Sequence, residues 1–253
     1  LETLREEYYR ASATISTRVG DAKLRAPRGG TSLITPDCLE RLRPLLQPGD
    51  ILIERRNWYL SNAFLPGYWP HAALYVGSTE DLIAMGLADD PAVAKWQREF
   101  AARDAQGHAL RVIEAVSEGV VFTSLEHSVG EADAVAVLRP KLSAAEKRQV
   151  IANAFSHVGK PYDFDFDFFS SDKLVCTEVV YRSFGELLDV PLVEIMGRQT
   201  LPAINIVQAW AAGDQLEFVA LLDGNERTGK CEWADEATLR ESLNRPALTV
   251  LNP

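Results

Sequence analysis

Short apolar runs of strand length recur along the chain, and each is bounded by glycine, proline or charged residues. Runs of this length and aliphatic content, separated by turn residues, are typical of β-strands. A turn at Glu118-Gly119 would join two consecutive runs as a hairpin. We therefore predict a mainly antiparallel sheet, with strands at residues 51–54, 71–76, 111–116, 120–122, 134–138 and 216–222.

Capping signals and apolar residues at helical spacing predict helices between these strands. Residues 143–146 read Ser-Ala-Ala-Glu, a capping-box pattern, and the helix that follows should end at Gly159. A second helix is expected from Val175 to Leu188, which puts Cys176 in its first turn. Shorter helices are expected at residues 1–18, at residues 36–42, around Trp210 and at residues 235–243.

No internal repeat, low-complexity tract or linker divides the sequence. A chain of 253 residues can bury one sizeable core, so we expect a single domain over residues 1–253. Residues 1–34 would form an N-terminal helical extension and residues 203–253 a C-terminal extension. Residues 87–108, with the acidic pair Asp89-Asp90, are expected to form a loop that helps to shape a pocket.

The charge balance excludes a broad affinity for nucleic acid. Lys and Arg total 26 against 36 Asp and Glu, a net charge of -10, so the phosphates of a duplex would on balance be repelled. No run approaches the roughly 20 apolar residues that span a bilayer, and the first ten residues are charged rather than signal-like. The compartment stays open, because an upstream segment can have been removed.

The three cysteines differ in their surroundings along the chain. Their number and spacing do not indicate a disulfide framework. A thiol attacks a carbonyl well only as the thiolate, which a helix N-terminus and a nearby imidazolium both favour. Cys176 is placed for the first effect, and His71, at the start of a predicted strand, would supply the second. The alternatives are a small buried thiol at Cys176 and a merely hydrogen-bonded His71.

A catalytic base needs a third group that fixes its ring, and Glu114 is the candidate. It stands in the middle of the apolar run 111–116, where a carboxylate needs a partner. If the two strands pair, Glu114 can face His71; the alternative is that it points to solvent. Glu118, beside a turn glycine, is the reserve candidate.

The remaining polar patterns have local explanations. His157 falls in the last turn of a helix, where a cation suits the dipole, and His108 and His127 lie in polar stretches that look like loops. Asp163, Asp165 and Asp167 alternate with phenylalanines, but the spacing does not fit a calcium loop. An extended segment with its aromatic residues inward and its carboxylates outward explains the alternation better.

Four segments together carry a family resemblance: Pro48-Gly-Asp-Ile-Leu-Ile53, His71-Ala-Ala-Leu-Tyr-Val-Gly77, Gly159-Lys-Pro-Tyr-Asp-Phe164 and Leu174-Val-Cys-Thr-Glu-Val-Val180. They resemble the permuted branch of the NlpC/P60 superfamily, the YiiX/YebB-like papain-fold hydrolases. The order discriminates, because here the histidine strand precedes the cysteine helix, as it does in the permuted group and in the lecithin:retinol acyltransferase relatives.

The resemblance implies an α+β, circularly permuted papain-like fold with an antiparallel sheet packed against helices. It implies Cys176 as nucleophile, His71 as base and Glu114 as the residue that orients the imidazole. Tyr162 is similar to the tyrosine that borders the site in these enzymes and would contact the substrate. The sequence reads Val-Cys-Thr-Glu instead of the common Asp-Cys-Ser-Gly, which weakens any transfer of cell-wall peptide specificity.

The expected function is that of a cysteine peptidase or amidase acting on a small peptide, amide or acyl substrate through an acyl-enzyme, with no metal and no cofactor required. One alternative is a thiol acyltransferase or lipid esterase, for which the aromatic loop 58–69 could supply a membrane contact. The other is a non-catalytic binding module on the same fold. A thiol of ordinary pKa at Cys176 would favour the module.

Overall fold

A computed structural model describes residues 32–57, 67–163, 171–195 and 198–247 of the chain. Its centre is a seven-stranded sheet in the order β4-β3-β2-β1-β5-β8-β9, in which every neighbouring pair is antiparallel. The prediction of an antiparallel sheet is therefore confirmed. The strands are β1 (Ile51–Arg55), β2 (His71–Tyr75), β3 (Leu110–Val116), β4 (Gly119–Ser124), β5 (Ala134–Pro140), β8 (Leu216–Asn225) and β9 (Lys230–Ala234). A separate hairpin pairs β6 (Val193–Ile195) with β7 (Arg198–Thr200).

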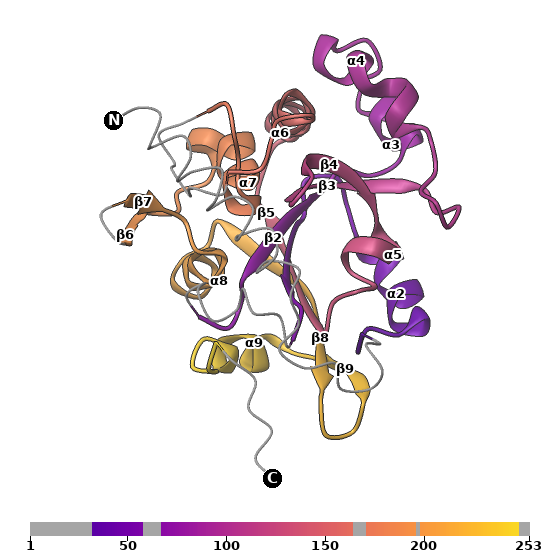
Figure 1. Cartoon of the computed structure of the whole chain (residues 1–253). Coiled ribbons are helices and arrows are strands. Elements are labelled where there is room, and N and C mark those ends of the chain that lie inside the picture. Colours follow the sequence, from indigo (N-terminus) through magenta and orange to yellow (C-terminus); the bar gives the residue numbers. More distant parts are fainter. Residues whose placement is uncertain (1–31, 58–66, 164–170, 196–197, 248–253) are drawn as a thin grey trace, which may run out of the picture.

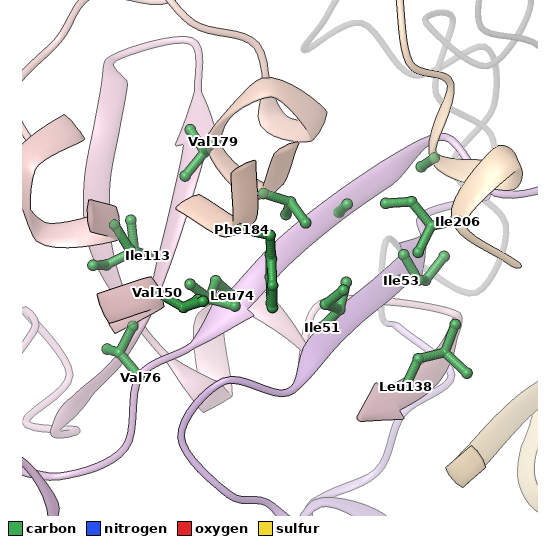
Figure 2. Close-up of a cluster of buried hydrophobic side chains, with 14 of the residues drawn as sticks. Ile51, Ile53, Leu74, Val76, Ile113, Leu138, Val150, Val179, Phe184 and Ile206 are labelled. Carbon is green, nitrogen blue, oxygen red and sulfur yellow. The ribbon is translucent and has the colours of Figure 1, made fainter. Parts of the chain in front are cut away.

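The two faces of the large sheet carry separate apolar cores. The larger core contains side chains of α4, α6, α7 and α8, and the smaller one contains side chains of α2 and α5. In Figure 2, Val179 and Phe184 of α7 and Ile206 of α8 lie beside Leu74 and Ile53 of the sheet. The helices that contribute are α2 (Pro36–Leu42), α4 (Pro91–Phe100), α5 (Leu125–Ser128), α6 (Ala144–His157), α7 (Cys176–Phe184) and α8 (Ala203–Ala212) (Figure 1).

Side-chain caps begin the predicted helices as the sequence indicated. Ser143 and Glu146 form a complete capping box at the start of α6. Thr35 accepts a hydrogen bond from the Cys38 N–H at the start of α2, with proline in the first turn. Asp235 caps the C-terminal helix α9 (Glu236–Ser242) in the same way. These three helix starts are confirmed.

Two expectations about helices are wrong. The helix that begins at Cys176 ends at Phe184 rather than at Leu188, because Gly185 takes a positive φ of 55° and a single 3-10 turn follows. The expected loop 87–108 contains α4, and a further short helix, α3 (Thr79–Ala84), precedes it. Asp90 accepts hydrogen bonds from the first N–H groups of α4, and Phe100 at its other end is buried.

The β3–β4 hairpin is tied to the segment that leads toward Cys176. The N–H of Val120 donates to the carbonyl of Lys160 at 2.8 Å, and the N–H of Gly159 donates to the carbonyl of Val120 at 2.9 Å. Gly119, with a φ of +113°, allows this approach, because a Cβ there would lie 2.5 Å from the Lys160 carbonyl oxygen. The turn therefore fixes where the chain passes before it enters α7.

Several sequence expectations fall outside the described residues, namely the helix at 1–18, most of the aromatic loop 58–69, and Asp165 and Asp167. At the end of that loop, Tyr68 and Trp69 are buried in the larger core. Among the described helices, none combines the length and the apolar character needed to cross a membrane.

Candidate active site

Cys176 is the first residue of α7, a helix that is held in place by core packing and by hydrogen bonds at its start. Val179 and Phe184 pack into the larger core, and Val175 precedes the helix as its N-cap. The buried carboxylate of Glu178 accepts the N–H of Val175 at 3.0 Å and pairs with Arg182 at 3.2 Å. Cys176 itself is 8% exposed, so the helix presents a nearly buried thiol at its positive end.

His71 reaches the same place from the first residue of β2. Its Nε2 lies 2.7 Å from Oε2 of Glu114, a hydrogen bond across neighbouring strands. β2 and β3 pair Leu74 with Ile113, and the same register puts Glu114 opposite Ala73. Ala73 is two residues from His71, so the side chains of Glu114 and His71 lie on the same face of the sheet. The structure thus brings His71 and Glu114 together by sheet register alone.

Glu114 is fully buried and held on both carboxylate oxygens. Oε2 meets the imidazole, and Oε1 accepts a hydrogen bond of 2.6 Å from the hydroxyl of Thr123 on β4. Burial opposes ionisation, but the hydrogen bond and the charge of His71 outweigh it and hold the pKa of Glu114 at about 2, below its ordinary 4.5. Glu114 is therefore a carboxylate at neutral pH and does not point to solvent.

Cys176 and His71 shift each other's pKa in the directions that favour an ion pair. Burial alone would raise the pKa of the thiol, yet the charge and the hydrogen bond of His71 bring it below 9.0. Burial alone would lower the pKa of His71, yet Cys176 and then Glu114 raise it well above 6.5. Because Nε2 is bonded to Glu114, Nδ1 is the ring nitrogen left to face the thiol.

Tyr162 lies beside this pair, in the segment that bridges to the start of α7. It pairs with Leu174 in an isolated β-bridge, two residues before Cys176. Its hydroxyl is electrostatically linked to Cys176, and burial followed by the charges of Cys176, Asp163 and Glu178 raises the pKa of Tyr162. The phenol is therefore a neutral donor next to the thiol at all working pH values.

Two polar side chains of this site escaped the sequence analysis. Thr123, which fixes Glu114, lies at a diagonal position across the β3–β4 hairpin, and only the register reveals it. Glu54, also fully buried, is the direct cross-strand partner of His71. The signal for Glu54 was present in the sequence, because it is a carboxylate beside an apolar strand run, as Glu114 is.

Three local expectations are corrected by the structure. Asp163 is 1% exposed rather than outward-facing, because the bridge at Tyr162 draws its backbone against Leu174. His157 is not a cation at the end of α6, since burial and then the charge of Lys160 lower its pKa to about 4. His127 lies in α5 rather than in a loop and contacts Glu131 at 3.0 Å.

Among the described residues, Glu54, His71 and Glu114 place three potential metal ligands within 4.8 Å of one another. The atoms of His71 and Glu114 are 2.7 Å apart. A zinc ion at the usual ~2.0–2.1 Å from both would subtend about 80°, well below the tetrahedral angle. The spacing is that of a hydrogen bond, so this donor set fits a proton-carrying network better than a metal centre.

Comparison with known proteins gives a family match that covers most of the chain. The model of a family described as permuted papain-like amidase enzymes, YaeF/YiiX or C92, matches residues 45–244, which run from before β1 to beyond α9. The curated proteins and the solved structures that were compared give no match. The family match confirms the resemblance to YiiX-like hydrolases and the α+β permuted papain-like fold. The chain belongs to the permuted papain-like amidase family YaeF/YiiX and is a cysteine amidase-type hydrolase.

Proposed function

We propose that the protein hydrolyses amide bonds of peptide or amidated substrates through an acyl-enzyme on Cys176, with His71 as acid and base and Glu114 as the residue that orients it. The observation that supports this most strongly is the row Cys176–His71–Glu114. A thiol at a helix N-terminus faces an imidazole whose far nitrogen is bonded to a buried carboxylate at 2.7 Å.

In the first half of the reaction the Cys176 thiolate attacks the amide carbonyl carbon. The C=O electron pair moves to oxygen, where the N–H of Cys176 can donate to it, because the first N–H groups of a helix have no acceptor within the helix. The tetrahedral adduct then collapses and the C–N bond breaks. The proton on Nδ1 of His71 goes to the leaving nitrogen, which departs as an amine.

In the second half, water attacks the thioester carbonyl. Neutral His71 now takes a proton from the water, the C–S bond breaks, and the acid leaves with Cys176 returned as thiolate. Glu114 stays ionised throughout, since its pKa of about 2 is far from neutral, and stabilises the imidazolium each time it forms. The scheme requires no metal and no cofactor.

Tyr162 is proposed to border the substrate. Its uncharged hydroxyl lies near Cys176, where it can donate to the carbonyl oxygen of the substrate or of the adduct. The acyltransferase alternative gains no support from the described end of the aromatic loop, because Tyr68 and Trp69 are buried.

The test is to trap the acyl-enzyme. The protein is mixed with a panel of peptide arylamides and the corresponding aryl esters, quenched in acid after milliseconds to seconds, and its intact mass is measured. We expect a mass increase equal to the acyl group, mapped to Cys176 and lost in Cys176→Ala. Cys38→Ala is the matched control, because Cys38 is also buried in the first turn of a helix.

An acyl adduct that persists in Cys176→Ala, or that maps to another residue, would overturn the proposed nucleophile. Hydrolysis of the panel by wild type at the same rate as by Cys176→Ala would overturn the acyl-enzyme route itself. Loss of turnover in Cys38→Ala as well, with both variants folded and no acyl adduct on Cys176 in the wild type, would show that thiols affect the reaction without acting as the nucleophile.

A further inference from the structure

Glu54 of β1 is a second buried carboxyl group beside the catalytic histidine, and the mechanism above does not use it. It is the Cα partner of His71 across the β1–β2 ladder, and it is 0% exposed. The hydroxyl of Ser128, in α5, donates to its Oε1 at 2.6 Å. Its Oε2 is buried without a hydrogen-bond partner among the described residues. The ligand atoms of Glu54, His71 and Glu114 lie within 4.8 Å of one another.

The charges around Glu54 act in opposite directions, and burial is the largest influence on its ionisation. Glu114 on β3, ionised and buried, opposes the ionisation of Glu54, whereas the charge of His71 on β2, which is already bonded to Glu114, favours it. Directly after β1, Arg56 attracts Glu54, but the side chain of Arg56 is 24% exposed and pairs with Glu131. The β5 partner of Glu54 is Val135, which carries no charge, and on α5 His127 is paired with Glu131.

Burying an ionised carboxylate with one oxygen unbonded is far more costly than burying the uncharged acid in the same place. Two carboxyl groups that share one site also oppose each other's ionisation. Burial and then the charge of Glu114 accordingly raise the pKa of Glu54 above 4.5, opposite in direction to the shift at Glu114. The two carboxyl groups are therefore shifted in opposite directions although they lie beside the same imidazole.

We propose that Glu54 is a positioning residue of the catalytic site: as an uncharged carboxylic acid packed against the His71–Glu114 pair, it fixes the imidazole and keeps a single negative charge on its Nε2 side. The inference rests on the proposed function for its catalytic meaning, while its protonation can be measured independently of any reaction.

The charge of Glu54 has a direct consequence for His71. One buried carboxylate stabilises the imidazolium enough to hold the thiolate, yet the proton must still pass to the leaving amine. A second anion would bind that proton more tightly and make His71 a poorer acid. When the pH rises far enough to ionise Glu54, kcat should therefore fall, and Glu54 should contribute to the alkaline limb of the pH profile.

The first experiment is infrared difference spectroscopy of the substrate-free protein at pH 7, wild type minus Glu54→Gln. We expect a carboxylic-acid C=O band in the wild type that the variant lacks. Glu217→Gln, at an exposed glutamate on β8, is the control and should remove only carboxylate bands. A difference spectrum for Glu54→Gln that contains carboxylate bands and no acid band overturns the inference, whether or not the protein is an amidase.

The second experiment measures kcat and KM against pH for Glu54→Gln and Glu54→Ala, with the substrate identified by acyl-enzyme trapping. The glutamine keeps an uncharged group of the same shape, so we expect kcat within about threefold of wild type at pH 6–7 and an alkaline limb moved to higher pH. The alanine side chain no longer packs against the imidazole, so kcat of Glu54→Ala should fall roughly tenfold or more with little change in KM. A Glu54→Gln variant that loses kcat as severely as Glu54→Ala would show that the ionised form is needed, which contradicts the proposal.

A stability measurement covers the case in which Glu54→Ala does not fold. A carboxyl group whose folded pKa is raised keeps its proton in the folded protein at pH values where the unfolded chain has lost it, so its contribution to stability falls as the pH rises above about 4.5. The urea midpoint of wild type should therefore fall relative to Glu54→Gln between pH 4.5 and 7. A constant difference between the two proteins over this range would contradict the proposal.

Discussion

Replacing Glu114 with glutamine isolates the role of one charge in the site. The amide keeps the shape of the side chain and an oxygen that can accept from Nε2 of His71, but it removes the negative charge 2.7 Å from the ring. The imidazolium then loses its buried counter-ion, while Cys176 and the helix are untouched. The change tests whether Glu114 stabilises the protonated ring or only occupies space.

The size of the effect follows from the linkage between the two groups. The pKa of Glu114 falls from 4.5 to about 2, and His71 is the largest of the causes that lower it. The net shift of Glu114, from 4.5 to about 2, is about 2.5 pH units or roughly 3 kcal/mol, and an interaction that lowers the pKa of one partner raises that of the other. The pKa of His71 should therefore fall in Glu114→Gln, because the variant removes the negative charge that helps to raise it.

The assay is an NMR titration of the histidine ring signals in labelled protein, with the His71 signal assigned by its absence in His71→Ala. The matched control is Glu118→Gln, an exposed glutamate at the tip of the same hairpin and the reserve candidate from the sequence. We expect the His71 midpoint to fall in Glu114→Gln and to stay in place in Glu118→Gln. A His71 midpoint that does not move in Glu114→Gln would refute the reasoning. A His71 midpoint that moves only in Glu118→Gln would show that Glu118, and not Glu114, is the carboxylate that stabilises the protonated ring.

Further predictions concern support of the site and stability. Thr123→Val removes the 2.6 Å hydrogen bond to Glu114, so kcat should fall while Thr123→Ser restores it, as steady-state kinetics can show. Glu114 stabilises the fold above pH 4.5 by an amount on the order of 3 kcal/mol, and this contribution should be lost as the pH falls from about 4.5 to about 2. Urea unfolding of the wild type should show this loss, and urea unfolding of Glu114→Gln should not. Phe184→Ala empties a buried position in the larger core and should cost about 3–5 kcal/mol of unfolding free energy, against little for the exposed Leu45→Ala. A Phe184→Ala variant as stable as Leu45→Ala would contradict the packing of α7.

The sequence was sufficient wherever local chemistry decides the structure. The capping box specifies the start of α6, because the capping side chain and the N–H that it accepts from are only three residues apart. Apolar runs bounded by turn residues specify the strands. Asp90-Pro91, an N-cap residue followed by proline, marks the start of α4, where the sequence analysis expects a loop. The short helix α5 gives no periodic pattern, since four residues make barely one turn.

The site is different, because its members meet through register and not through sequence spacing. Cys176 and His71 were recognised from their motifs, and Glu114 from its position in an apolar strand. Glu54 and Thr123 are set by which residues lie opposite one another in the ladders, and a shift of one residue would turn each of them to the other face. The interpretation of the chain as one domain stays a proposal; it is supported by β8 and β9, which extend the central sheet.

The central claim is that His71 makes Cys176 a thiolate. Its most direct test is the rate of iodoacetamide alkylation of each cysteine against pH, followed by peptide mass spectrometry in wild type and in His71→Ala, with Cys38 and Cys231 as internal references. The account predicts that Cys176 in wild type reacts with a midpoint below the ordinary thiol pKa of ~8.5, and that His71→Ala moves this midpoint to or above that value. A Cys176 that titrates like an ordinary thiol in wild type, or whose low midpoint survives without His71, would contradict it.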